Sequence, residues 1–133
     1  MTVQDVIEFV HAQRAIRGEQ KVLRNWSDGS IALSIVHAIE RGGFGCVVTN
    51  GKLTGFCFGM PRHTERVFDV TQIVCASPRD LAHLLLLFEG SFRGWTLRGF
   101  RRKKVESKSL VDYKRIQRLS HLSQLTASNY VSI

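Results

Sequence analysis

The sequence has little proline, few cysteines and no long apolar run. Its 133 residues include 2 Pro and 3 Cys, and the longest apolar stretch is Leu84–Phe88. A membrane-spanning helix needs about 20 apolar residues, so no membrane span is expected. The N-terminus also lacks the basic start and apolar run of a secretory signal. We therefore expect a protein of the reducing cytoplasm.

The cysteines and histidines are not spaced for metal binding. Cys46, Cys57 and Cys75 each lie in an apolar stretch, and the chain has no C-x-x-C pair. A free cysteine in such a stretch behaves as a small buried hydrophobe. The 5 histidines are scattered along the chain. The sequence thus predicts neither a disulfide scaffold nor a metal site.

Positive charge is concentrated in one segment. The composition, 44% hydrophobic and 23% charged, is that of a single globular domain over residues 1–133. The segment Arg93–Arg118 holds ten basic and two acidic residues, and the remaining chain holds nine of each. Such a segment favours a polyanionic partner: nucleic acid, an anionic membrane surface or a phosphate-bearing ligand. The alternative is a solvated face that keeps a small protein soluble.

Local signals mark four helices. Thr2 with Asp5 forms a variant of the capping box, and Ser77 with Pro78 has the N-cap and N1 residues of a helix start. Apolar residues follow each start at helical spacing. The expected helices are residues 2–17, a second one capped by Ser27 or Asp28 and ended by Gly42-Gly43, residues 77–93, and a last one that begins at Ser107 or Ser109 and runs to Leu122.

The remaining apolar stretches are typical of strands. Asn50-Gly51 predicts a type I′ hairpin turn. The expected strands are Phe44–Thr49, Lys52–Gly59, Arg66–Cys75, Trp95–Phe100 and an optional edge strand at Tyr130–Ile133, with a loop at Met60–His63. The helix before Trp95 makes the fourth strand parallel to the third, whereas the first three are antiparallel. The predicted fold is α/β (α+β), a mixed and mainly antiparallel sheet flanked by helices, in the order α-α-β-β-β-α-β-α(-β).

This order resembles the GNAT superfamily of N-acetyltransferases. The resemblance covers Thr2–Leu122 and is carried by the hairpin Gly51–Phe56, the strand–helix unit at Val67–Ser77, the strand Trp95–Phe100 and the segment Ser109–Lys114. In that family a central strand splays from its parallel neighbour, and the cofactor lies in the gap. The resemblance therefore implies an N-acyltransferase that uses acetyl-coenzyme A.

The resemblance also implies a set of site residues. The cofactor-binding residues would be Val74, Cys75, Ala76, Ser77 and Arg79. Tyr113 would be the general acid, and Glu65 or Asp69 would be the base for an incoming amine. Each has a structural alternative: a plain helix N-cap for Ser77, a half-buried aromatic for Tyr113, and surface carboxylates for Glu65 and Asp69.

The chain departs from the family at the pyrophosphate loop. The family pattern, Arg/Gln-x-x-Gly-x-Gly/Ala, presents backbone N–H groups to the phosphates. Here Cys75–Asp80 has no glycine, Pro78 lacks an N–H group, and Asp80 adds a negative charge that Arg79 could partly offset. The family's first strand is also absent. Small members with similar departures occur among bacteriophage proteins, and some of them are virion- or DNA-associated.

The densest basic cluster suggests a second kind of site. It consists of Arg98, Arg101, Arg102, Lys103 and Lys104. In an extended segment these side chains would alternate between two faces and suit a phosphate backbone. Trp95, Phe100 and Tyr113 could stack on bases, or could pack in the core. The cluster could instead hold the 3′-phosphate of coenzyme A.

Two functions from different classes follow. One is a GNAT-like acyltransferase. The other is a non-catalytic, virion-associated or host-cytoplasmic protein that binds nucleic acid or an acidic protein partner through the basic segment. The sequence predicts no oligomeric state.

Overall fold

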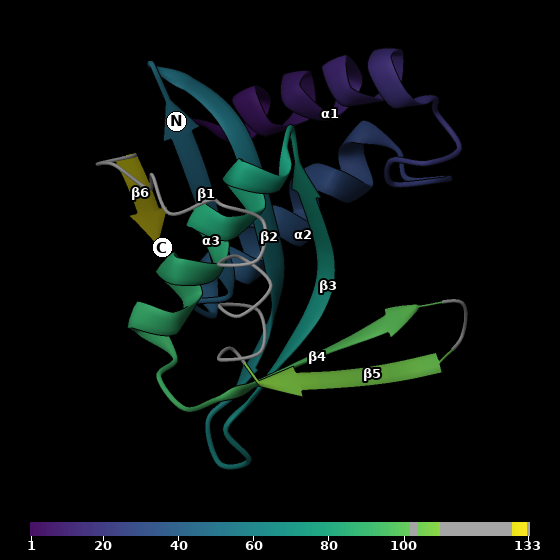
Figure 1. Ribbon diagram of the computed structural model, residues 1–133. Coiled ribbons are helices and arrows are strands. Elements are labelled where there is room, and N and C mark those ends of the chain that lie inside the picture. Colours follow the sequence, from purple (N-terminus) through teal and green to yellow (C-terminus); the bar gives the residue numbers. More distant parts are fainter. Residues whose placement is uncertain (102–103, 110–128, 133) are drawn as a thin grey trace.

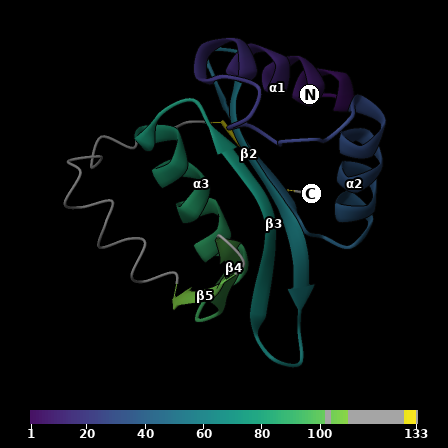
Figure 2. The same ribbon diagram turned by 90° about the vertical axis from the view of Figure 1, so that its right-hand side faces the viewer.

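The protein forms three layers, helices on both sides of one sheet (Figure 2). The computed structural model describes residues 1–101, 104–109 and 129–132. Helices α1 (Val3–Arg17) and α2 (Asp28–Glu40) cover one face of the sheet, and α3 (Pro78–Ser91) covers the other. None of the helices in these residues is long and apolar enough to cross a membrane.

The sheet is mixed and mainly antiparallel (Figure 1). Its strands are β1 (Phe44–Thr49), β2 (Lys52–Arg62), β3 (Val67–Cys75), β4 (Thr96–Arg101), β5 (Lys104–Ser109) and β6 (Asn129–Ser132). Their spatial order is β5-β4-β3-β2-β1-β6. Among the strands of the described residues, only β3 and β4 are parallel neighbours. The predicted fold class, a mixed sheet flanked by helices, is confirmed.

The predicted helix starts and hairpin turn are present. The Thr2 side chain accepts the Asp5 N–H, and the Asp5 carboxylate accepts the Thr2 N–H, so the capping box is complete. Both residues of the β1–β2 turn have positive φ, 53° at Asn50 and 77° at Gly51. A type I′ turn requires this conformation at both positions.

Each face of the sheet carries its own core. Strand residues alternate between the two faces, and the buried ones separate accordingly. Toward α1 and α2 lie Phe44, Cys46, Phe56, Phe58 and Val74. Toward α3 lie Val47, Cys57, Phe68, Cys75 and Leu97. The three cysteines are free and buried, as predicted.

The predicted loop at Met60–His63 is wrong. Strand β2 continues to Arg62, which pairs with Val67, and the turn follows it. Residues two apart on a strand direct their N–H groups to the same side. Gly59 donates its N–H toward β1, so Pro61, which has no N–H, lacks a donor on the β1 side. There β1 has already ended, because Phe44 at its start pairs with Phe58.

The chain after β4 also differs from the prediction. Residues Lys104–Ser109 form β5, which pairs antiparallel with β4, so no helix begins at Ser107. The rest of the expected last helix, residues 110–122, lies outside the described residues. The optional edge strand is present as β6, which pairs antiparallel with β1.

Candidate functional site

The predicted cofactor loop lies between the end of β3 and the start of α3. Val74 and Cys75 are buried, and the Ala76 N–H donates to the Thr54 carbonyl at 2.8 Å. This bond extends the β2–β3 ladder by one residue. One backbone donor of the loop is therefore already used within the sheet.

Helix α3, which follows the loop, begins with a complete N-cap at Ser77. The Ser77 hydroxyl accepts the Asp80 N–H at 3.2 Å and donates to the Asp80 carboxylate at 2.6 Å. Pro78 occupies the first turn, and Asp80 is buried. A diphosphate here would face a buried carboxylate, one position without an N–H group and one donor already bonded. The residues of this loop do not fit the pyrophosphate of coenzyme A.

Arg17, the last residue of α1, contacts the end of β3 from the layer formed by α1 and α2. Its guanidinium donates to the Cys75 carbonyl, 58 residues away in the sequence. A surface cavity of about 310 Å³ adjoins this contact and is lined by Arg17, Ile73, Cys75, Ala76, Ser77, Pro78 and Leu81. The sequence analysis missed Arg17, because no local pattern connects the end of a helix with a strand so far along the chain.

Burial disfavours the reactive form of the cysteines in the core. Burial raises the pKa of the Cys75 thiol to about 12, with a further contribution from the charge of Asp80. Burial likewise raises the pKa of Cys46 to about 11 and that of Cys57 well above its usual range. The thiolate is the reactive form, so these side chains serve packing.

Asp69 is bound between two guanidinium groups. It accepts from Arg98 Nη2 at 2.8 Å and also from Arg62, so one carboxylate joins β2, β3 and β4. The hydrogen bond from Arg98 is the main cause that lowers the pKa of Asp69, and Arg62 adds to it. A carboxylate with a lowered pKa is a weaker base.

The predicted catalytic residues are not brought together with the loop. Asp69 and Val74 lie five residues apart on one strand, roughly 16 Å at about 3.3 Å per residue. Glu65 is exposed in the turn before β3, farther still from Ser77. Tyr113 lies outside the described residues. The described residues therefore assemble no acid–base pair at the loop.

The basic cluster is divided by the β4–β5 hairpin. Arg98 lies in β4 and is engaged with Asp69. Arg101 pairs with Lys104 at the end of the ladder, while Arg102 and Lys103 lie outside the described residues. The expected comb along one extended segment is therefore wrong, because its residues belong to two antiparallel strands and their connection.

Trp95 is partly buried and packs against the core on the α3 side of the sheet. Its ring lies against Phe92 and His63, with ring centroids 4.8 Å and 5.1 Å away. The packing interpretation is thus confirmed for Trp95. The side chains of Phe100 and Tyr113 lie outside the described residues.

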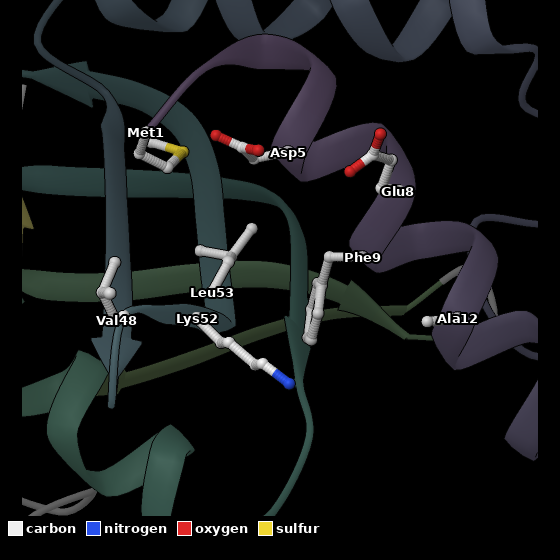
Figure 3. Close-up of a pocket in the computed structure, with 9 residues that line it drawn as sticks. Met1, Asp5, Glu8, Phe9, Ala12, Val48, Lys52 and Leu53 are labelled. Carbon is white, nitrogen blue, oxygen red and sulfur yellow. The ribbon is translucent and has the colours of Figure 1, made fainter.

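The largest of the surface cavities described was not predicted. It measures about 570 Å³ and lies between α1 and the β1–β2 hairpin (Figure 3). Phe9, Val48 and Leu53 line it, with Glu8 on the helix and Lys52 on the strand. Another acidic residue of the rim, Asp5, is already hydrogen-bonded to Thr2. The cavity is open to solvent, and its charged residues are exposed.

Neither a metal-binding cluster in the described residues nor a known relative indicates a function for these surfaces. Within residues 1–101, 104–109 and 129–132, no cluster of three or more histidine, cysteine or acidic residues could hold a metal. The chain matches no protein-family model, no curated protein and no solved structure.

Proposed function

We propose that this is a non-catalytic nucleic-acid-binding protein that contacts the phosphate backbone with the end of its β4–β5 hairpin. One observation carries the proposal. Four cations are consecutive in the sequence, Arg101–Lys104. Arg101 ends β4, Lys104 begins β5, and the two form the last pair of the ladder. The hairpin extends from the edge of the sheet, away from β6 (Figure 1).

The base of the hairpin is well anchored. Arg98 is bonded to Asp69, the Thr96 N–H donates to the Arg66 carbonyl at 3.1 Å, and Leu97 is buried against the α3 face. A two-stranded ribbon is narrow enough for the major groove of DNA, about 12 Å wide. Because the chain outside Arg93–Arg118 has no net charge, we expect the attraction to phosphate to come from that segment, which contains the hairpin.

The test replaces Arg101, Arg102, Lys103 and Lys104 by alanine. We expect the affinity for a short labelled DNA duplex to fall at least about tenfold, because phosphate contacts dominate such binding. The matched control removes four charges from exposed positions elsewhere: Lys21, Arg24, Arg41 and Lys52. Fluorescence anisotropy at fixed salt measures both variants. An equal loss of affinity in the two variants would mean that only net charge attracts DNA.

An acetyl-coenzyme A-dependent N-acyltransferase is the second candidate. It is favoured by the limited pairing of β3 with β4, which covers only Val67–Asp69 before the strands diverge (Figure 1). The contacts at Ser77 and Asp80 oppose it. Calorimetric titration with acetyl-coenzyme A decides between the two candidates. We expect no heat of binding up to millimolar cofactor, and saturable binding would favour the enzyme.

A further inference from the structure

Among the described strands, none pairs with one edge of β3 over its C-terminal half. β3 pairs with β2 from Val67 to Cys75, with one register shift at Thr71, but with β4 only from Val67 to Asp69. Beyond Asp69, no other strand in the described part of the chain pairs with this edge. An interior strand with one open edge exposes main-chain groups that another extended chain can bond.

The register identifies those groups. The Ala76 N–H donates to β2, and hydrogen-bonding direction alternates along a strand, so Val74 also faces β2. Ile73 and Cys75 therefore direct their main-chain groups toward the open edge. The Cys75 carbonyl is taken by Arg17. No bonding partner among the described residues is seen for the N–H and C=O of Ile73 or the N–H of Cys75, which leaves these groups for a ligand.

The side chains beside this edge are apolar. Ile73 is 40% exposed, and it lines the 310 Å³ cavity together with Pro78 and Leu81. An added strand would place alternate side chains on this face, where one apolar side chain can cover Ile73. The buried Asp80 carboxylate at the same end disfavours a phosphorylated occupant.

We infer that the open edge of β3 binds an extended peptide segment of a partner protein by strand addition. Main-chain hydrogen bonds to Ile73 and Cys75 hold the segment, and an apolar side chain of the segment packs on Ile73. This inference does not depend on nucleic-acid binding by the hairpin, so either can fail alone.

Amide hydrogen exchange followed by NMR first tests whether the edge is open. We expect the Ile73 and Cys75 amides to exchange about 100-fold faster than those of Val74 and Ala76, which are bonded to β2. These neighbours are internal controls. Slow exchange at all four amides in the protein alone would mean that another part of the chain covers the edge, and would overturn the inference.

A peptide titration then tests strand addition. The probe is an acetylated and amidated hexapeptide of alternating valine and threonine, and its control carries N-methyl groups on alternate amides. We expect the probe to slow exchange at Ile73 and Cys75 at least tenfold at millimolar peptide, and the control to have no effect. Equal effects of the two peptides, no protection by either, or protection by acetyl-coenzyme A instead would each overturn the inference.

A pair of variants locates the contact. Ile73→Lys should abolish the protection of Cys75 by the probe and leave DNA affinity unchanged. Leu33→Lys changes an apolar residue of α2 that is 58% exposed, and it should retain the protection. Both sites are exposed, so both variants should fold, which circular dichroism checks. Retained protection in Ile73→Lys would place the peptide elsewhere and contradict the inference.

Discussion

At the residue scale, Asp69 links the base of the hairpin to the two strands beside it. Its carboxylate meets guanidinium groups from β2 and β4, and Arg98 lies opposite it at the last pair of the parallel ladder. Sequence reasoning treated Asp69 as a candidate base and Arg98 as a phosphate contact. Their pairing could not be predicted, because it joins residues 29 positions apart and depends on the parallel register.

Asp69→Asn should lower the melting temperature by a few degrees at neutral pH. The pKa of Asp69 is lowered in the folded protein, so its contribution to stability is present above the ordinary aspartate pKa, about 3.9. The contribution is lost as the pH falls through the folded-state value. Melting curves from pH 7 to pH 2 should therefore show the two proteins converging in acid.

Glu19→Gln is the control for this prediction. Glu19 is exposed in the loop after α1, and its substitution should leave the melting temperature nearly unchanged. A difference between wild type and Asp69→Asn that stays constant down to pH 2 would contradict the ion-pair account.

At the element scale, short sequence patterns predicted the helix starts and the hairpin turn, which depend mainly on neighbouring residues. The capping box at Thr2, the N-cap at Ser77 and the turn at Asn50-Gly51 are all present. Strand β5 was missed because Lys104–Ser109 has no apolar alternation, and it is a strand only through its pairing with β4. The end of β2 was missed because proline is typical of a loop. Pro61 fits the strand only because β1 does not extend beside it, and the sequence does not show where that pairing ends.

The same glycine-to-alanine change should have opposite effects in two elements. Gly51 has a φ of 77°, so Gly51→Ala should lower the free energy of unfolding by about 1 kcal/mol. Gly90 lies in α3, and a Cβ added there would meet no atom within 4 Å, so Gly90→Ala should raise the free energy of unfolding by about 0.5–1 kcal/mol. Chemical denaturation measures both, and effects of the same sign would contradict these backbone assignments.

At the scale of the whole molecule, the charge and the fold separate into two parts. A chain portion without net charge forms most of the layered body, and the cationic segment begins just before the β4–β5 hairpin at the edge of the sheet. The sequence correctly predicted that the net positive charge lies in Arg93–Arg118 and that β3 ends at Cys75. It could not show that the Ser77 loop is closed by its own hydrogen bonds, because these depend on side-chain conformation.

The salt dependence of DNA binding tests the central claim most directly. The logarithm of the dissociation constant is measured against the logarithm of salt concentration for the wild type and for the variant with alanine at residues 101–104. Each lost phosphate contact should reduce the slope by about 0.9, and thus by up to about 3.6 for four contacts. The control without Lys21, Arg24, Arg41 and Lys52 should keep the wild-type slope. Equal slopes for the wild type and the hairpin variant would contradict the account.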